Sequence, residues 1–168
     1  CGMGASFLDE GDFAVGVEGS DYSRILGRAE WARYPGNLVT ADITEPFDLE
    51  MDFVPLRFNT VTLWEVFEHI QEHKLPALMD NIGRHLDRNG GIIASVCTVP
   101  DVYEGMAMHQ TVKPLSWWRE LFSTRFIIED ALMQLDFTYV RSKVENGQLM
   151  YHDGNVEEFK SLFWVRKK

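Results

Sequence analysis

Cysteine is scarce in this sequence, and neither a basic cluster nor a long apolar run occurs in it. The chain has two cysteines, Cys1 and Cys97, which are too few for a disulfide framework and favour a reducing compartment such as the cytoplasm. No apolar run approaches the ~20 residues of a membrane-spanning helix, and no signal peptide is visible. These absences predict a cytoplasmic protein with no membrane partner.

Acidic residues outnumber basic ones, and the basic ones are scattered along the chain. The 16 lysines and arginines against 26 aspartates and glutamates give a net charge of −10 at pH 7. A nucleic-acid binder needs lysine and arginine clustered against the phosphates, so the charge pattern predicts no nucleic-acid partner. On its own the acidity indicates only a soluble protein.

The length and the order of the segments indicate one α/β domain. A chain of 168 residues is long enough for a single domain with a real core, so we expect one domain over residues 1–168. Apolar runs typical of buried strands alternate with segments that carry apolar residues at helical spacing. Strands are predicted over residues 13–18, 37–43, 58–66 and 92–99, and helices over residues 5–11, 20–31 and from 75 to the Asn89-Gly90-Gly91 stop.

The sequence also predicts where the helices begin and end and which of their faces are buried. Gly11 is expected to end the first helix as its C-cap. Ser20 or Asp21 is expected to start the second helix as its N-cap. The faces expected to be buried are Tyr22, Ile25, Leu26 and Ala29 in the second helix and Leu75, Leu78, Ile82 and Leu86 in the third.

Strands and helices that alternate at these lengths imply right-handed βαβ crossovers. The predicted fold is therefore a doubly wound, mostly parallel α/β sheet of the Rossmann-like type. Ligands of such sheets bind beyond the carboxyl ends of the strands, in the crevice where the strand order reverses. The residues that follow each predicted strand are therefore the candidates for a binding site.

The first four residues, CGMG, read as a glycine loop of the kind that follows a strand and opens a helix. Gly2 and Gly4 allow a tight turn and a close approach of the backbone to a ligand. A dinucleotide-binding loop has a third glycine where Phe7 stands, and a Walker loop has a lysine that is absent here. The loop thus favours a nucleoside ligand without a pyrophosphate, although an isolated Gly-x-Gly pair is also common in ordinary turns.

Two acidic residues follow predicted strands. Glu18 ends the strand after the glycine loop, where a carboxylate can accept hydrogen bonds from both hydroxyls of a ribose; a solvated strand end is the alternative. Asp42 ends the next strand and can accept from an exocyclic amine such as that of adenine. The alternative for Asp42 is a turn cap before Thr44 and Pro46. Taken in order, the glycines and the two acids predict a ribose and an adenine across adjacent strand ends.

The motifs in this order resemble those of class I S-adenosylmethionine-dependent methyltransferases. The resemblance runs from residue 1 to about residue 100 and is carried by CGMGASFL, VGVEGS, VTADI and WEVFEHI followed by LPALMDNIGRHLDRNGGIIASV. Its most specific part is E-V-x-E-H-I followed by G-G-I-I. In that family the glycine loop reads Asp-x-Gly-Cys-Gly-x-Gly after the first strand, and this chain starts at the corresponding cysteine.

The resemblance implies S-adenosylmethionine as the cofactor and S-adenosylhomocysteine as the product, and no metal site is predicted. It implies that Glu18 holds the ribose, and that Asp42 and the Ile43 backbone frame the adenine. Gly2 and Gly4 would approach the amino-acid part of the cofactor. The complete set of implied cofactor-binding residues is Cys1, Gly2, Gly4, Glu18, Gly19, Asp42, Ile43, Trp64 and Glu65, of which the last two would line the cofactor beneath the reacting centre.

The first strand of that family lies at the centre of its sheet and precedes the glycine loop. No counterpart of this strand is present here, so we expect the domain to be N-terminally truncated. A central gap would leave rows of unpaired backbone groups, each costing about 1–3 kcal/mol when buried. The parallel strands expected at residues 13–17 and 60–63 would then flank a position that another segment has to fill.

Methyl transfer from a sulfonium depends mainly on the in-line alignment of the acceptor. A base is required only when the acceptor is a hydroxyl or a protonated amine. His69, after the strand at 58–66, and His109, after the strand at 92–99, are the two candidates for that base. Packing at a helix start is the alternative for His69, and a surface-loop position is the alternative for His109.

The segment 100–117 is the candidate acceptor-binding loop, because long ordered connections often form lids or binding loops. The C-terminal segments 126–144 and 157–168 are expected to supply the antiparallel strand pair that ends the sheet of the family. An adaptable apolar surface in the loop would be formed by Tyr103, Met106, Met108 and Trp117, whereas Trp118, Leu121 and Phe122 have the helical spacing of core residues.

The sequence thus predicts an enzyme that transfers the methyl group of S-adenosylmethionine to a small molecule, such as a sugar or another metabolite, by in-line displacement. One alternative is a methyltransferase-like binding or scaffold domain without catalysis. The other is a nicotinamide-dependent oxidoreductase, which Phe7 in the glycine loop disfavours.

Overall fold

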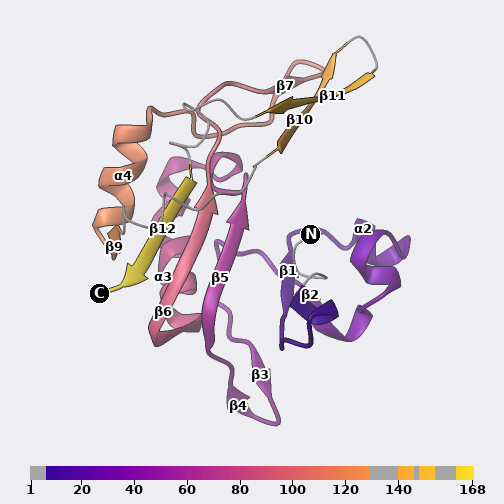
Figure 1. The fold of residues 1–168 in the computed structure, drawn as a ribbon, viewed down its shortest axis with the longest axis vertical. Helices are drawn as coiled ribbons and strands as arrows, with labels where there is room; N and C mark the ends of the chain where they lie inside the picture. The colour runs from indigo at the N-terminus through magenta and orange to yellow at the C-terminus, as the bar shows by residue number, and fades with distance from the viewer. Residues whose placement is uncertain (1–6, 129–139, 146–147, 154–161) are drawn as a thin grey trace. The chain divides into compact units, whose positions relative to one another are not determined.

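The structure is a computed structural model that describes residues 7–128, 140–145, 148–153 and 162–168 (Figure 1). The chain forms two compact units, Cys1–Phe47 and Asp48–Lys168. The predicted glycine loop lies outside the described residues. In the part of the chain that the structure describes, no helix is both long and apolar enough to cross a membrane.

A short parallel strand pair forms the sheet of the first unit. Strand β1 (Gly16–Glu18) pairs with β2 (Leu38–Thr40), and both are shorter than the predicted strands. The chain between them contains helical turns, so this segment is a parallel crossover as predicted. The connecting elements are α2 (Tyr22–Ile25), η1 (Ala29–Ala32) and η2 (Pro35–Asn37).

The prediction of a single helix over residues 20–31 is wrong. The α-helix ends at Ile25, and Gly27 then adopts a φ of 57°, in the left-handed region that commonly ends a helix. Tyr22, Ile25 and Leu26 are exposed, with 58%, 74% and 49% of their surface accessible. These three residues of the predicted apolar face are therefore not part of a core, because one helical turn cannot carry a long buried stripe.

The predicted end of the first helix and the predicted start of the second are confirmed. Gly11 has a φ of 88° and donates its N–H to the Leu8 carbonyl at 3.1 Å, so it ends the helical residues 7–9 as predicted. At the start of α2, Ser20 Oγ accepts the N–H of Tyr22 at 3.2 Å. Asp21 instead forms an ion pair with Arg24 at 2.7 Å.

The larger sheet lies in the second unit and joins four strands in the order β5 (Phe58–Trp64), β6 (Leu86–Ser95), β12 (Leu162–Lys167) and β9 (Phe126–Ile128) (Figure 1). Strands β5 and β6 are parallel, whereas β12 runs antiparallel to both β6 and β9. The antiparallel pair β9–β12 agrees with the prediction for the C-terminal segments. The α/β content is thus confirmed, but the described sheets are small and mixed, because the last strands enter antiparallel.

Three hairpins provide the other described strands of the second unit. Positive φ values occur at Asp52 and Phe53 in the first hairpin and at Glu104 and Gly105 in the second. Positive φ at both central residues is the type I′ geometry, which matches the twist of the paired strands. The hairpins are β3 (Glu50–Met51) with β4 (Val54–Pro55), β7 (Val102–Tyr103) with β8 (Met106–Ala107), and β10 (Val140–Glu145) with β11 (Gln148–Asp153).

Helix α3 (Leu75–His85) carries the apolar stripe predicted from the sequence. It follows two turns of 3-10 helix, η3 (Phe67–His69) and η4 (Glu72–Lys74). The stripe residues of α3 are buried, but Leu86 begins β6 instead of continuing the helix. The helix therefore ends before the predicted Asn89-Gly90-Gly91 stop, which lies inside β6.

Contacts from β12 stabilise the early end of α3. Lys167 Nζ donates to the Gly83 carbonyl at 2.7 Å and to the Leu86 carbonyl at 3.3 Å. The last carbonyls of a helix have no hydrogen-bond partner within the helix. A cation at this position also interacts favourably with the negative end of the helix dipole. A contact between residues far apart in the sequence therefore stabilises the end of α3.

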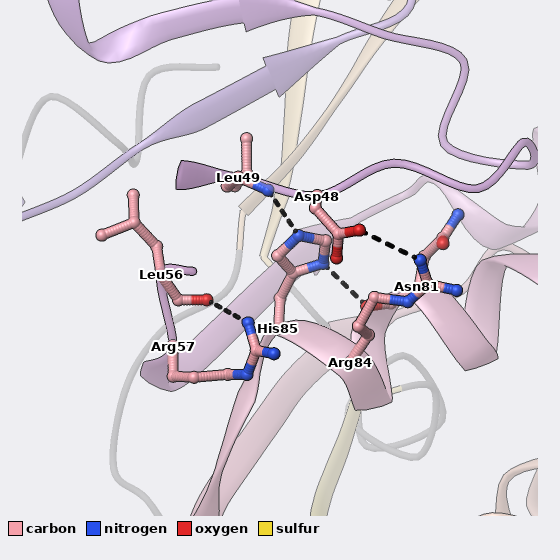
Figure 2. A network of polar contacts seen from close by, with 7 residues as sticks. All are labelled: Asp48, Leu49, Leu56, Arg57, Asn81, Arg84 and His85. Carbon is pink, nitrogen blue, oxygen red and sulfur yellow. Dashed lines mark hydrogen bonds and ion pairs between the residues drawn. The ribbon is translucent and has the colours of Figure 1, made fainter. Parts of the chain in front are cut away.

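The buried His85 joins the end of α3 to the chain just before β3 (Figure 2). Its Nδ1 lies 2.9 Å from the Asn81 carbonyl oxygen, and its Nε2 lies 3.0 Å from the Leu49 nitrogen. A carbonyl only accepts, so Nδ1 carries the hydrogen, while Nε2 accepts the Leu49 N–H. Arg84 and Asp48, the neighbours of His85 and Leu49 in the sequence, form an ion pair in which a guanidinium nitrogen lies 3.5 Å from a carboxylate oxygen, and Figure 2 also shows it.

The core of the second unit contains three aromatic rings in contact. Phe67, Trp118 and Phe122 are fully buried. The ring centroid of Phe67 lies 4.9 Å from that of Phe122 and 6.3 Å from that of Trp118, both in edge-to-face geometry, which aromatic pairs prefer. Trp118 and Phe122 belong to α4 (Leu115–Ser123), so their prediction as core residues is confirmed, whereas Leu121, which is predicted with them, is half-buried.

The irregular start of β6 depends on Gly90. Phe58 lies opposite Leu86, but Thr60 lies opposite Gly91, so β6 contains extra residues at this point. A Cβ on Gly90 would lie 2.9 Å from the Phe58 carbonyl oxygen and 3.0 Å from Leu86 Cδ2. Only glycine allows this close approach without a shift of the backbone.

Alanine substitutions at Gly83 and Gly90 should change stability in opposite directions. Gly90→Ala forces a methyl group against the Phe58 carbonyl and should lower the free energy of unfolding by about 1–3 kcal/mol. Gly83→Ala meets no atom within 4 Å, and alanine is favoured over glycine inside a helix by up to ~1 kcal/mol. Urea unfolding of both variants measures the two changes, and a loss of similar size in both would contradict the argument.

Candidate functional site

In the first unit, Glu18 lies at the carboxyl end of β1 and is held there by Trp31. The indole Nε1–H of Trp31 donates to Glu18 Oε2 at 2.7 Å. Trp31 is buried and Glu18 is half-buried. Because a buried indole N–H needs an acceptor, this bond fixes the direction of the carboxylate. No motif includes Trp31, and only that need for an acceptor could have indicated its role.

Asp42 follows β2 and forms the turn cap that was the alternative interpretation of this residue. Its Oδ1 accepts the Thr44 N–H at 2.9 Å and the Thr44 hydroxyl at 2.7 Å. Such a bond from an aspartate to the backbone two residues on is an Asx turn. Since Glu18 lies opposite Thr40 in the parallel register, Glu18 and Asp42 both lie at the carboxyl end of this strand pair.

The other predicted cofactor residues are distributed over three parts of the chain. Gly19 and Ile43 directly follow the two acids, and Gly19 is exposed while Ile43 is half-buried. Trp64 and Glu65 belong to the second unit. The residues that lie outside the described part of the chain are Cys1, Gly2 and Gly4.

In the second unit, two reciprocal hydrogen bonds tie the carboxyl ends of β5 and β6 together. The Glu65 N–H donates to Ser95 Oγ at 3.1 Å, and the Ser95 hydroxyl donates to Glu65 Oε1 at 2.8 Å. Glu65 has a φ of 54°, which is uncommon for a residue other than glycine. Backbone strain of this kind concentrates at functional sites, so the end of β5, with Trp64 and Glu65, is a candidate for one.

Glu68 is a fully buried acid just beyond this strand end. Its Oε1 accepts the Cys97 N–H at 2.9 Å, and its backbone carbonyl accepts the N–H groups of Gln110 and Thr111 at 2.7 and 3.0 Å. Oε2 has no hydrogen-bond partner among the residues that the structure describes. Burial raises the pKa of Glu68 to about 7, and the nearby Glu65 carboxylate adds to the rise.

His69 and His109, the two candidates for a base, lie beside each other. Their ring centroids are 4.9 Å apart, with the planes at 80°. His69 Nδ1 lies 2.9 Å from the Met108 carbonyl oxygen, and His109 Nδ1 lies 2.6 Å from the Val99 carbonyl oxygen. Because a carbonyl oxygen only accepts, each Nδ1 carries a hydrogen, and the neutral rings keep a lone pair on Nε2.

The structure therefore brings together Glu68, His69 and His109 from two distant parts of the sequence. One candidate ligand atom from each of the three lies within 4.8 Å of the other two. The sequence pattern assigns no role to Glu68. The signal that could have indicated it is its place as the second acid of E-V-x-E-H-I, directly before His69.

The segment predicted as the acceptor loop, residues 100–117, contains the β7–β8 hairpin. Tyr103 and Met106 are exposed, with 62% and 61% of their surface accessible. Trp117 is only half-buried, and Lys113 Nζ lies 5.2 Å above its ring. Since the Met108 carbonyl binds His69, this segment is joined directly to the histidine pair.

Glu68→Gln should flatten the pH dependence of stability between pH 4.5 and 7. The folded chain holds the Glu68 proton up to about pH 7, whereas the unfolded chain releases it near 4.5. The stability from this group is thus fully present below pH 4.5 and is lost as the pH rises through 7, on the order of 3 kcal/mol in total. Urea unfolding at a series of pH values, in a buffer with EDTA, measures the slope.

The control for this prediction is Glu120→Gln, which changes an exposed acid on α4. This variant should keep the slope of the wild type, because its carboxylate stays in water in both the folded and the unfolded chain. Parallel curves for the wild type and Glu68→Gln would contradict the assignment of the slope to Glu68.

The comparison with protein families matches residues 1–142 to a model described as a methyltransferase domain. The match spans β1, β2, β5 and β6, and it includes both the acids of the first unit and the Glu68 group of the second. A search of the curated proteins finds no match.

Several solved structures share the fold. The PH0226 protein of Pyrococcus horikoshii OT3 is similar with a TM-score of 0.61 and 19% identity, over 100% of this chain and 79% of that chain. The 1,6-didemethyltoxoflavin-N1-methyltransferase of Burkholderia thailandensis, with bound S-adenosylhomocysteine, has a TM-score of 0.57 and 15% identity over 97% of this chain and 64% of its own. The magnesium protoporphyrin IX methyltransferase of Synechocystis PCC 6803, also with bound S-adenosylhomocysteine, has a TM-score of 0.54 and 14% identity over 99% of this chain and 69% of its own.

At these identities the structural likeness shows the fold, and the family match shows the relationship. The match covers most of the chain and includes every motif on which the resemblance rests. The predicted resemblance to class I S-adenosylmethionine-dependent methyltransferases is thereby confirmed, and the chain belongs to the methyltransferase domain family.

Proposed function

We propose that this chain transfers a methyl group from S-adenosylmethionine to a small-molecule acceptor. The observation that carries the proposal is the match of residues 1–142 to the methyltransferase domain. Two proteins of similar fold were crystallised with S-adenosylhomocysteine, the product that such a transfer leaves. A doubly wound, mostly parallel sheet, as the family resemblance implies, is part of the same proposal.

The acids at the carboxyl ends of β1 and β2 fit a nucleoside ligand. A carboxylate can accept hydrogen bonds from both hydroxyls of a ribose, and the bond from Trp31 gives Glu18 a fixed direction for this. Asp42 lies at the same end of the strand pair. We therefore assign the ribose to Glu18 and the adenine to Asp42 and the Ile43 backbone. The family resemblance alone adds the glycine loop, Trp64 and Glu65 as further cofactor residues.

When bound, S-adenosylmethionine supplies an activated methyl group on its sulfonium sulfur. The residues of the chain have to orient the acceptor and, for a hydroxyl or a protonated amine, to remove a proton. His69 and His109 can accept that proton at Nε2, because the carbonyls that bind each Nδ1 hydrogen hold the rings in one tautomer. His69 is exposed, so an acceptor can reach it from solvent.

The surface of the β7–β8 hairpin favours an acceptor with an apolar part. Val102, Tyr103 and Met106 are each more than 60% exposed on this hairpin. Aromatic and thioether side chains form adaptable apolar surfaces. The net charge of −10 disfavours a nucleic-acid acceptor, and the two cysteines favour the cytoplasm as the location.

Glu18→Gln should weaken the binding of S-adenosylmethionine. Glutamine keeps the size of the side chain but loses the negative charge, and a hydrogen bond to a charged group contributes about 1.5–3 kcal/mol. The dissociation constant should therefore rise about 10- to 100-fold. Calorimetric titration of the cofactor into the full-length protein measures this change.

Glu10→Gln is the matched control for Glu18→Gln, because Glu10 is an exposed acid in the same unit that no proposed contact uses. Its affinity for the cofactor should equal that of the wild type. If the wild type itself gave no heat, the scaffold alternative would replace the proposed enzyme. An unchanged affinity in Glu18→Gln would contradict only the assignment of the ribose.

Removing both histidines should slow methyl transfer without weakening the binding of the cofactor. General base catalysis contributes about 10²–10⁴-fold to a rate, so His69→Ala with His109→Ala should lower the rate by a factor in this range for a hydroxyl acceptor. The rate is measured as the formation of S-adenosylhomocysteine when the protein is incubated with each of a panel of small hydroxyl and amine acceptors. The buffer contains EDTA. His73→Ala, an exposed histidine of η4, should keep the rate of the wild type.

A further inference from the structure

Glu68, His69 and His109 share a feature that a base alone does not require. Each of the three side chains has one polar atom bonded to the backbone, and its other polar atom has no backbone hydrogen bond among the residues that the structure describes. Glu68 Oε1 accepts the Cys97 N–H at 2.9 Å, and the two Nδ1 atoms lie 2.9 and 2.6 Å from backbone carbonyl oxygens. Their orientations are therefore fixed before any ligand binds.

This arrangement is typical of metal ligands. A histidine that binds a metal almost always donates its other ring N–H to a carbonyl or a carboxylate, which fixes the tautomer and the ring orientation. His69 and His109 both donate in this way, to the carbonyls of Met108 and Val99. One ligand atom from each of Glu68, His69 and His109 lies within 4.8 Å of the other two, so a modest adjustment of the side chains would bring all three to the roughly 2.0–2.2 Å at which zinc binds nitrogen and oxygen ligands.

The second oxygen of Glu68 is an independent observation that points to a ligand. Glu68 is 0% exposed, and its Oε2 has no hydrogen-bond partner among the described residues. Buried polar atoms are nearly always satisfied by the protein, by water or by an ion, so such an oxygen requires an explanation. A cation bound between Glu68 and the two histidines would satisfy it.

We propose that Glu68, His69 and His109 bind a divalent transition-metal ion of the Zn²⁺ type. Two imidazoles and one carboxylate are a donor set that zinc takes where a further position stays open. Mg²⁺ and Ca²⁺ prefer about six or more oxygen ligands, which this group does not offer. His69 is exposed, so an ion can enter from solvent.

The metal site does not depend on the proposed methyl transfer. It uses the same nitrogen lone pairs that would otherwise accept a proton, so a bound ion and a transferred proton exclude each other on His69 and His109. The activity of the histidine variants is therefore measured with EDTA, while metal binding is measured directly and without any acceptor.

Calorimetric titration of Zn²⁺ into the metal-free, full-length protein tests the site. The wild type should bind one ion at this group, and Mg²⁺ should give no heat. Glu68→Gln and His109→Ala should each weaken this binding by at least about 100-fold, because losing a ligand exceeds the 10- to 100-fold effect of losing an outer partner. His73→Ala, an exposed histidine outside the group, should bind Zn²⁺ as the wild type does.

Two further variants keep the test decisive. His69→Ala changes an exposed side chain and replaces Glu68→Gln if that variant fails to fold by circular dichroism. Cys97→Ser tests the neighbouring group of Glu65, Glu68 and Cys97, whose ligand atoms also lie within 4.8 Å of one another. The absence of Zn²⁺ binding in the wild type would overturn the proposal. Binding that Cys97→Ser weakens, while the histidine variants leave it unchanged, would also overturn it.

Discussion

The candidate site of the second unit depends on one buried carboxylate. Glu68 joins three segments of the chain, because its own backbone follows β5, its Oε1 binds the Cys97 N–H after β6, and its carbonyl binds the N–H groups of Gln110 and Thr111 after β8. The buried Thr111 adds a hydrogen bond from its hydroxyl to the Ile70 carbonyl at 2.7 Å. These hydrogen bonds position the chain segment that carries the second histidine of the pair.

Two acids of the same short motif have contrasting environments. Glu65 is half-buried and exchanges hydrogen bonds with Ser95, so it closes the ends of β5 and β6. Glu68 is fully buried, and burial raises its pKa to about 7. Since Glu68 changes its charge near neutral pH and carries one oxygen without a described partner, it can respond to a proton or a cation, whereas the Glu65 carboxylate accepts the hydrogen bond of the Ser95 hydroxyl.

Part of the candidate site could be predicted from local patterns. Glu18 and Asp42 were identifiable because each follows an apolar run, and the turn at Asp42 was identifiable because an aspartate bonds to the backbone two residues on. Trp31 was not, because its bond to Glu18 joins residues that no local pattern relates. The prediction of a helix over residues 20–31 was wrong for a related reason, because it also depended on contacts beyond the local pattern. Apolar residues at helical spacing form a buried face only where another surface packs against them, and the single turn before Gly27 is too short for such packing.

The sequence by itself determined the strand β5, the buried stripe of α3, the aromatic pair on α4 and membership of the methyltransferase domain family. These features follow from periodicity and from motifs whose residues are close along the chain. Only the tertiary structure decided the early end of α3 beneath Lys167, the irregular start of β6 at Gly90, and the meeting of Glu68 with the two histidines. Each of these depends on contacts between distant segments, which form only when the chain has folded.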